Sequence, residues 1–297
     1  MKNEVLSSPI RWAGSKKRIL NEMLESFKKD KENYIEPFLG SGVVMINVLN
    51  NIDTLHYKNI YVNDINSNII HFYKFLKTKP KVLIQSLLEL SENYNCKSYD
   101  EQEKMYYEIR EKFNNTEDNR EIYFYYLMKV GFNGVYRENK LGKFNVPFGR
   151  KEKFIVNEDM LLTISKLIKN VKFYNLSYEK FLDMLSKKGI LNNSFIYCDP
   201  PYIPDDELVS QKQELYTSGK FNHYDFVKKL KTFNNSDIMV SMSESTKAKK
   251  IYGTYFIRKN LVDIIRTINP QKLFKSKEIL LINYQDNNWF LGTLLGA

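Results

Sequence analysis

Short apolar runs rich in β-branched and aromatic residues recur along this chain, and they alternate with segments of helical periodicity. The expected strands cover residues 34–36, 59–62, 171–174, 194–198, 237–241, 254–258 and 278–284. The expected helices cover residues 16–28, 42–50, 68–77, 157–169, 178–187 and 224–232. Strands that alternate with helices form a mostly parallel sheet with helices on both faces. The pattern therefore predicts an α/β fold with about seven strands, mostly parallel, of which the last two form an antiparallel hairpin.

The middle of the chain departs from this alternation, because residues from about 78 to 130 contain helical patterns one after another. Met105, Ile109 and Phe113, for example, share one face of a helix. Residues 135–137 and 144–147 then flank a polar, basic segment, which predicts a β-hairpin. The whole stretch is interpreted either as an ordinary insertion or as a module that contacts a substrate.

Composition narrows the possible partners. The 297 residues are 43% hydrophobic and carry a net charge of +10, with a pI of about 9.2. A basic excess favours a polyanionic partner, and a lysine-rich surface without such a partner is the alternative. Cys96 and Cys198 are the only cysteines, and without zinc-ligand spacing we expect no disulfide and no metal. No apolar run approaches the roughly 18 residues of a membrane span, so we expect a soluble, cytoplasmic protein.

A glycine-rich turn, Glu36 to Gly42, follows the first expected strand and precedes a helix. Glycines there allow a ligand to approach the backbone, at the edge where open α/β sheets bind ligands. The turn is not a dinucleotide fingerprint, because Met45 stands where a third glycine is needed. Asp64 follows the next strand, where an acidic residue accepts the ribose hydroxyls of an adenosine. The alternative is that Asp64 or Asn66 caps the next helix.

A second motif, Asp199 to Tyr202 with two central prolines, directly follows the apolar run 195–198. The prolines end the strand, so Asp199 and the Pro200 carbonyl become fixed acceptors for the N–H groups of a base. Tyr202 is suited to stacking on a base that has left the duplex. A structural proline turn is the alternative. Cys198 precedes the motif in a buried strand, where an inert thiol is more common than a nucleophile.

Together these strings resemble the Dam-type family of DNA adenine-N6 methyltransferases, in its alpha-group motif order. The resemblance extends from Arg11 to about Tyr284. It rests on RWAGSK at 11–16, EPFLGSG at 36–42, NDIN at 63–66, YYEIREKFN at 106–114, GFNGVYRENKLGKFNVPFGR at 131–150 and DPPY at 199–202. It implies a Rossmann-like methyltransferase sheet in a catalytic domain, 1–74 and 154–297, that binds S-adenosylmethionine. It also implies an inserted helical target-recognition domain, 75–153, that carries the β-hairpin.

The resemblance also implies roles for single residues. Those that match the S-adenosylmethionine site are Trp12, Ala13, Gly14, Lys16, Glu36, Pro37, Phe38, Gly40, Ser41, Gly42, Asp64, Ile65 and Asp199. The matching catalytic residues are Asp199, Pro200, Pro201 and Tyr202. Those that match DNA contacts are Arg11, Arg110, Phe132, Asn133, Val135, Arg137, Asn139, Asn145, Pro147 and Arg150.

Among these, Arg137 matches the arginine that reads the guanine of a GATC site, and Phe132 and Asn133 match the wedge that replaces the flipped adenine. Val135 and Pro147 match apolar residues near the thymines. Phe132 stands where a relative has tyrosine and Val135 where leucine is familiar, so longer sites that contain GAT stay open.

The resemblance therefore implies methyl transfer from S-adenosylmethionine to N6 of an adenine flipped from double-stranded DNA, with GATC as the favoured site. Cytosine-N4 transfer by the same acceptors is an alternative, and so is a non-catalytic DNA-binding protein on the same fold. The missing third glycine disfavours a nicotinamide oxidoreductase. A restriction endonuclease is a possible functional partner, and we expect a monomer. Basic residues in 265–278 are expected to form a late loop that borders DNA.

Overall fold

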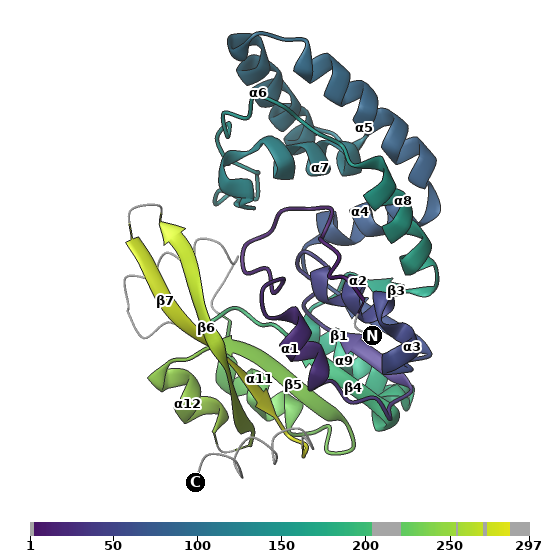
Figure 1. Cartoon of the computed structure of the whole chain (residues 1–297), viewed down its shortest axis with the longest axis vertical. Coiled ribbons are helices and arrows are strands. Elements are labelled where there is room, and N and C mark those ends of the chain that lie inside the picture. Colours follow the sequence, from purple (N-terminus) through teal and green to yellow (C-terminus); the bar gives the residue numbers. More distant parts are fainter. Residues whose placement is uncertain (1–2, 204–220, 254, 270–271, 286–297) are drawn as a thin grey trace.

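A computed structural model describes residues 3–203, 221–253, 255–269 and 272–285. In these residues seven strands form one sheet in the order β3-β2-β1-β4-β5-β7-β6 (Figure 1). Their bounds are β1 Asn33–Glu36, β2 Asn59–Asn63, β3 Lys172–Tyr174, β4 Ser194–Cys198, β5 Asp237–Ser243, β6 Ile257–Asn269 and β7 Lys272–Ile282. Neighbours among β1 to β5 are parallel, whereas β7 is antiparallel to both β5 and β6. The α/β fold, the mostly parallel sheet and the final antiparallel hairpin are thus confirmed.

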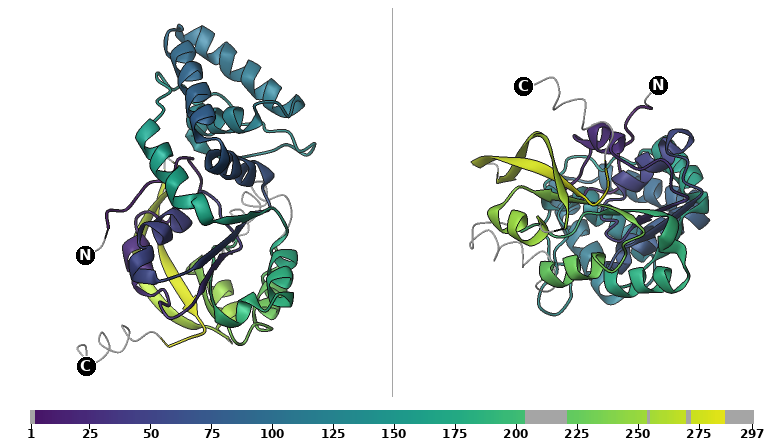
Figure 2. Two further views of the ribbon diagram at one scale, coloured as in Figure 1. Left: turned by 90° about the vertical axis from the view of Figure 1, so that its right-hand side faces the viewer. Right: turned by 90° about the horizontal axis from the view of Figure 1, so that it is seen from below.

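Helices cover both faces of the sheet (Figure 2). One face packs against α1 Leu20–Glu25, α2 Val43–Asn50, α4 Ser67–Thr78 and α8 Glu158–Leu167; the other packs against α9 Tyr178–Lys187, α11 His223–Leu230 and α12 Thr246–Tyr252. Alternation along β4 explains this division, because Phe195 and Tyr197 belong to one hydrophobic cluster and Ile196 and Cys198 to the other. A short helix, α3 Ile52–Leu55, leads from α2 towards β2.

Three further helices lie together at one end of the molecule, away from the sheet (Figures 1 and 2). They are α5 Pro80–Asn95, α6 Tyr99–Asn115 and α7 Arg120–Val130. Proline at the first position starts α5, and a capping box of Ser98 and Glu101 starts α6. Their buried aromatic side chains, such as Tyr94 and Tyr106, belong to the same hydrophobic cluster as one face of the sheet. The helical succession expected in the middle of the chain is therefore present.

The segment after α7 is less regular than the expected β-hairpin. A short 3-10 helix, η1 Phe132–Gly134, comes first. Isolated bridges then pair Gly131 with Phe148 and Glu138 with Phe144, without a continuous ladder. The chain does fold back on itself, because Asn145 N donates to the Arg137 carbonyl at 3.0 Å. We call residues 131–150 the recognition loop.

Other expectations were wrong in their bounds. The helix expected at 16–28 covers only Leu20–Glu25, because Lys16 turns inward to form an ion pair. The strand expected at 254–258 begins at Ile257 and continues to Asn269. The basic late loop expected in 265–278 is mostly strand, because β6 and β7 pair along this length despite their polar residues. Helix α12 was not expected; Ser245 caps it by accepting from Ala248 N. Within the described residues no helix is long and apolar enough to cross a membrane.

Candidate active site

The candidate motifs meet because β2, β1 and β4 are adjacent and parallel. In register, Glu36 at the end of β1 lies opposite Val62 of β2, and Ile35 lies opposite Ile196 of β4. The glycine turn, Asp64 and Asp199 therefore leave the sheet at one edge. The chain winds outward from β1 in one direction and from β4 in the other, so this edge is a topological switch point, where such sheets bind ligands.

The glycine turn depends on two left-handed backbone conformations, φ 51° at Gly40 and φ 72° at Gly42. A Cβ at Gly42 would lie 2.5 Å from the Tyr73 hydroxyl, so no larger residue fits there. A Cβ at Gly40 would lie 3.4 Å from Cδ1 of Trp12, whose ring borders the turn. The buried Ser41 carbonyl accepts from the Tyr73 hydroxyl at 2.5 Å. The turn is thus a rigid, narrow backbone surface.

Asp64 holds this turn from the neighbouring strand. Its Oδ2 accepts from Gly40 N at 2.8 Å, and its Oδ1 accepts from Asn66 N at 2.9 Å. Asn66, and not Asp64, is the side-chain cap of α4, because it accepts from Asn68 N at 3.0 Å. Burial raises the pKa of Asp64 to about 6, and the backbone N–H donors oppose this rise. The carboxylate has about four acceptor positions, so it can accept a further donor beside these backbone groups.

Glu36 lies beneath the turn and is almost fully buried. Burial raises its pKa well above the ordinary range, although Tyr34 donates to its Oε2 at 2.8 Å. The next residues form the wall of the site: the Pro37 carbonyl accepts from Asn63 Nδ2 at 3.1 Å, and the Phe38 ring packs on Tyr178 with centroids 5.6 Å apart. Ile65, in contrast, is 70% exposed.

Asp199 joins a buried polar cluster. Lys16 Nζ lies 2.5 Å from Asp199 Oδ2 and 3.8 Å from Glu278 Oε1, and it donates to the Gly14 carbonyl at 3.1 Å. Burial opposes a charge on Lys16, but Asp199, Tyr202 and Glu278 outweigh it and raise the Lys16 pKa. Lys16 Nζ also lies 5.1 Å from the Tyr202 ring centroid. The positive charge of Lys16 therefore joins two motifs that lie far apart in the sequence.

Glu278 was not among the expected site residues. It lies on β7, is fully buried, and accepts from the Tyr202 hydroxyl at 2.5 Å. A signal existed in the sequence, because a single carboxylate directly precedes the apolar run 279–282. Buried carboxylates of this kind need partners, and the partner cannot be read from the chain.

Cys198 does not have the surroundings of a nucleophile. Its side chain is fully buried in the cluster that covers the second face of the sheet. Burial, together with the nearby Asp199 and Glu36, raises the pKa of its thiol well above the ordinary value. A thiolate is therefore disfavoured, as the sequence predicted. In the described part of the chain no three His, Cys, Asp or Glu side chains gather as metal ligands would.

The residues expected to contact DNA lie on or beside the recognition loop. Arg137 donates from Nε to the Asn145 side chain at 2.7 Å, and from a terminal nitrogen to the Asn145 carbonyl at 3.0 Å. Phe132 is 49% exposed at the tip of its turn, next to Asn133 with φ 53°. Val135 is half-buried, and Pro147 is exposed.

Several of the expected phosphate contacts hold the loop itself. Asn139 Oδ1 accepts from Leu141 N at 2.9 Å and Lys143 N at 3.0 Å, which closes the tip. Arg110 on α6 donates to the Val146 carbonyl at 3.1 Å. Arg150 is exposed and has φ 53°, and Arg11 is exposed beside Gly134, where a Cβ would lie 2.7 Å from its Cβ. Arg110 and Asn139 thus have structural partners that their motif positions did not reveal.

Tyr136 connects the recognition loop to the glycine turn. Its ring stacks on Trp12, with centroids 5.6 Å apart, and its hydroxyl accepts from Asn68 Nδ2 on α4 at 2.9 Å. Trp12 in turn borders Gly40. The residue next to Arg137 is therefore packed directly against the side chains around the turn, a contact between segments far apart in the sequence.

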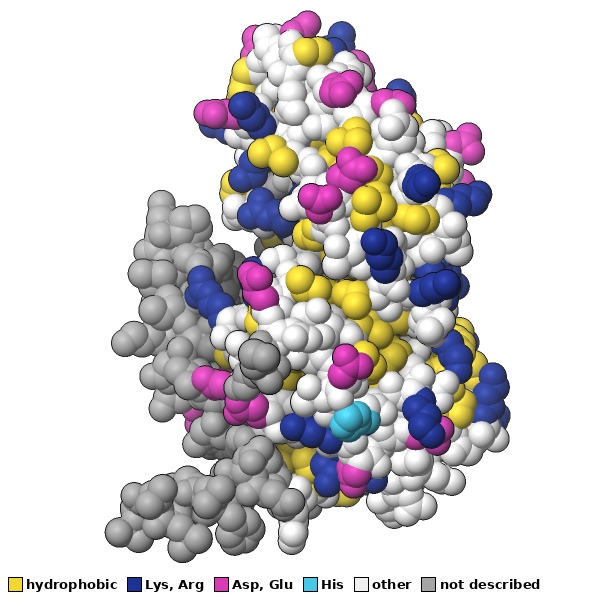
Figure 3. All heavy atoms as spheres, turned by 45° about the vertical axis from the view of Figure 1, so that its right-hand side comes forward, with side chains coloured by type: hydrophobic (Ala, Val, Ile, Leu, Met, Phe, Trp, Pro, Cys, Tyr) yellow, Lys and Arg dark blue, Asp and Glu magenta, His cyan; other side chains and the backbone are white. Residues whose placement is uncertain are grey.

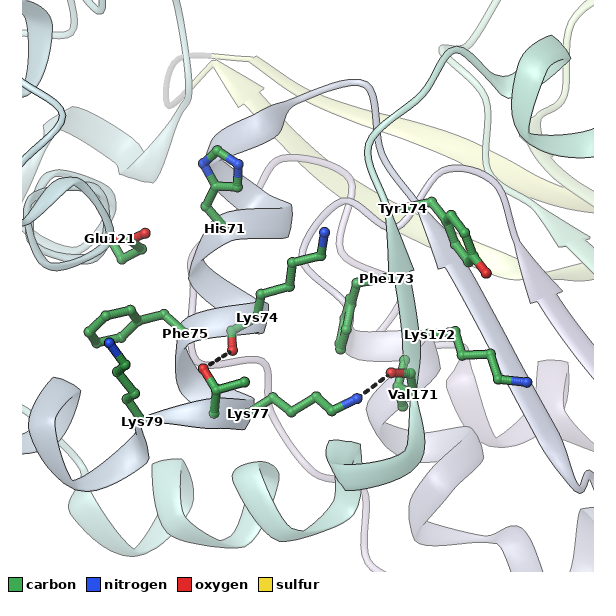
Figure 4. A pocket seen from close by; sticks show the side chains of 11 residues that line it. His71, Lys74, Phe75, Lys77, Lys79, Glu121, Val171, Lys172, Phe173 and Tyr174 are labelled. Atoms are coloured by element: carbon green, nitrogen blue, oxygen red, sulfur yellow. Dashed lines mark hydrogen bonds between the residues drawn. The ribbon is translucent and has the colours of Figure 1, made fainter. Parts of the chain in front are cut away.

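A separate hollow of about 560 Å³ lies between the carboxyl half of α4 and β3. Figure 4 shows its lysines, of which Lys77 reaches the Val171 carbonyl at 2.8 Å. It contains none of the expected site residues. On the face in Figure 3, Lys and Arg side chains are mixed with Asp and Glu. The net charge alone therefore does not locate a nucleic-acid surface on this face.

Comparison with known proteins decides the family. Residues 12–267 match the model of the D12 class of N6 adenine-specific DNA methyltransferases. The chain belongs to this family. It is therefore a DNA adenine-N6 methyltransferase of an S-adenosylmethionine-dependent family. This family membership decides for adenine-N6 over cytosine-N4 transfer and over a non-catalytic DNA-binding protein.

Relatives extend over most of this methyltransferase. The type II methyltransferase M.MjaIII of Methanocaldococcus jannaschii is 31% identical over 93% of this chain and 98% of its own length. The DNA adenine methylase of Haemophilus influenzae is 29% identical over 92% of each chain. That of Escherichia coli K12 is 33% identical over 66% of this chain and 64% of its own. The family match over residues 12–267 includes strands β1 to β5 and helices α5–α7.

Proposed function

We propose that this methyltransferase modifies N6 of the adenine in GATC sites of double-stranded DNA and uses S-adenosylmethionine as the methyl donor. The observation that carries the proposal is the meeting of three segments at one sheet edge: the glycine turn after β1, Asp64 after β2 and Asp199 after β4. A nucleoside-containing cofactor and a base then have adjacent sites. Their reaction becomes a matter of positioning.

The residues at this edge fit the proposed cofactor. Gly40 and Gly42 leave the turn without side chains at these two positions, and the Trp12 ring borders it, 3.4 Å from where a Cβ of residue 40 would stand. Asp64 has carboxylate oxygens suited to ribose hydroxyls, and Phe38 supplies an apolar wall. The proposed binding residues are those expected from the sequence: Trp12, Ala13, Gly14, Lys16, Glu36, Pro37, Phe38, Gly40, Ser41, Gly42, Asp64, Ile65 and Asp199. The cofactor supplies a sulfonium methyl group.

The catalytic residues act by holding the adenine. The Asp199 carboxylate and the Pro200 carbonyl accept the two N6 hydrogens, so that the nitrogen lone pair points at the methyl group. Tyr202 provides a ring on which the extruded base stacks, and Pro201 keeps the backbone rigid. Lys16 holds Asp199 through Oδ2 and keeps it from rotating away. The amino nitrogen would form a bond to the methyl carbon as the bond between that carbon and sulfur breaks, which would leave S-adenosylhomocysteine, and the nitrogen would release one proton. No metal or covalent enzyme intermediate is needed.

The recognition loop is proposed to read the site in the major groove. Arg137 pairs with guanine N7 and O6, for which Asn145 orients the guanidinium. Val135 and Pro147 lie near the thymine methyl groups, and the exposed Phe132, with Asn133, fills the gap left by the adenine. Arg11 is proposed to contact a base, and the proposed backbone contacts are Arg110, Asn139, Asn145 and Arg150. Guanine recognition by Arg137 is what favours GATC.

We further propose the two-domain division expected from the sequence. Residues 1–74 and 154–297 form the catalytic domain, and residues 75–153, with α5–α7 and the recognition loop, form the target-recognition domain. Relatives named type II methyltransferases support a functional link to a restriction endonuclease. We propose that the enzyme is cytoplasmic and monomeric.

The test uses purified enzyme with labelled S-adenosylmethionine and two matched duplexes, one with a single GATC site and one without. Label in N6-methyladenine on the GATC duplex alone supports the proposal. Equal label on both duplexes rejects GATC and the Arg137 assignment while the chemistry stands. Asp199→Ala should abolish transfer and leave the Kd for the duplex within about threefold of wild type, because it removes an acceptor and no phosphate contact. Near-normal turnover of this variant would remove Asp199 from catalysis.

A further inference from the structure

Glu278 is a buried carboxylate for which the proposed reaction gives no direct use. It is fully inaccessible to solvent, and it lies on β7, which is antiparallel to both β5 and β6. Its Oε1 accepts from the Tyr202 hydroxyl at 2.5 Å and from the Ser241 hydroxyl on β5 at 2.7 Å. A buried carboxylate costs free energy unless such donors hold it, so its contacts indicate what it does.

Lys16 lies between this carboxylate and the proposed catalytic residues. Its Nζ lies 3.8 Å from Glu278, 2.5 Å from Asp199, and 5.1 Å from the centroid of the Tyr202 ring. The same oxygen of Glu278 thus holds the tyrosine by its hydroxyl and attracts the lysine that holds the aspartate. Lys16 thus lies beside two carboxylates, Asp199 and Glu278, and the loss of Glu278 would leave it with only the first of these two.

We propose that Glu278 is a positioning residue for methyl transfer. It fixes the Tyr202 ring through the hydroxyl and places a second carboxylate beside Lys16, the residue that holds Asp199, so that Tyr202 and Asp199 present their adenine-binding groups together. The proposal rests on the proposed roles of Asp199 and Tyr202. The proposal gives a function to the hairpin of β6 and β7, because β7 places Glu278 against Tyr202 in the motif that follows β4.

The test compares Glu278→Gln with wild type in methylation of unmethylated genomic DNA. Such DNA contains every short site, so turnover does not depend on GATC, and a wild-type enzyme without activity would count against the proposed chemistry instead. A misaligned reacting group costs on the order of tenfold to a hundredfold in rate. We therefore expect kcat to fall by at least about tenfold while KM for DNA changes by less than about threefold.

Tyr202→Phe distinguishes positioning from a general loss of structure, because it removes only the hydroxyl that Glu278 holds. If Glu278→Gln and Tyr202→Phe both act by breaking the hydrogen bond between these two residues, the double variant should be no slower than the slower single variant. Independent damage would instead multiply the two effects. Ser241→Ala is the matched control: it removes the other donor to the same oxygen and should keep kcat within about twofold.

Two results would overturn the proposal. One is a kcat of Glu278→Gln within about twofold of wild type, and the other is multiplication of effects in the double variant. Thermal unfolding of each variant shows whether Glu278→Gln still folds. If it does not, Tyr202→Phe decides alone, because a turnover close to wild type would mean that the bond to Glu278 has no catalytic use.

Discussion

The proposed role of the buried Asp64 in holding the cofactor ribose predicts that cofactor binding depends on pH. Its pKa lies near 6 in the folded protein, against 3.8 for the ordinary side chain, because burial disfavours the charge. Ribose hydroxyls donate hydrogen bonds and need the ionised carboxylate as acceptor. If only this form binds, the apparent Kd is multiplied by one plus the ratio of protonated to ionised Asp64. That factor is close to one at pH 8 and about 11 at pH 5.

The same titration affects stability. Since the folded pKa is raised, the contribution of Asp64 to stability is fully present below pH 3.8 and is lost as the pH rises through about 6. Between pH 5 and pH 8 the ligand-free wild type should lose about 1.4 kcal/mol of unfolding free energy relative to Asp64→Asn, which cannot ionise. Asparagine keeps an acceptor for Gly40 N or Asn66 N, so the variant should fold.

Calorimetric titration with S-adenosylhomocysteine measures the binding effect without turnover, and urea unfolding measures the stability effect. Wild type should bind about tenfold more weakly at pH 5 than at pH 8. Asp64→Asn should bind weakly and with little dependence on pH. Glu36→Gln is the control, because the pKa of this neighbouring buried carboxyl is also raised. The prediction would be refuted if the dependence of the Kd on pH disappeared in Glu36→Gln and persisted in Asp64→Asn.

Three further predictions follow from individual contacts. Arg137→Ala should lose about 1–3 kcal/mol of discrimination at the guanine, measured as kcat/KM on GATC and single-substituted duplexes; unchanged discrimination would reject the assignment. Gly189→Ala should lower the free energy of unfolding by about 1–2 kcal/mol, because alanine is strained at the positive φ of this exposed site. Gly42→Ala should lower it by about 1–3 kcal/mol more, because the new Cβ would collide with Tyr73, and it should also weaken cofactor binding. Equal urea midpoints for the two variants would contradict this. Cys198→Ala should lower the free energy of unfolding by about 1 kcal/mol and keep full methylation activity, because the thiol only packs in the core. Loss of activity in a variant that still folds would instead indicate that Cys198 acts as a nucleophile.

Much of the fold could be predicted because the relevant signals are local. β4 and α9 have the expected bounds, since each has a strong periodic pattern between clear breaks. The strand paired with β7 was placed poorly, because polar residues of low β propensity interrupt the apolar pattern of residues 257–269, so the sequence does not show how far the strand extends. The sequence of the recognition loop predicts a hairpin, but the positive φ angles at Asn133 and Gly134 form a turn there in place of the regular backbone hydrogen bonds of two paired strands.

The sequence by itself determined the resemblance to a DNA methyltransferase family, because the glycine turn, Asp64 and the motif at 199–202 are short strings whose residue types and order can be recognised without a structure; it left cytosine-N4 transfer open, which the family match then excluded. Only the tertiary structure decided how these strings support one another. Glu278 reaches Tyr202 from a strand 76 positions later, and Lys16 reaches Asp199 across 183 positions. Such contacts have no local signal, because burial and strand order create them when the chain folds. The same holds for Tyr136, whose stacking on Trp12 brings the recognition loop against the glycine turn.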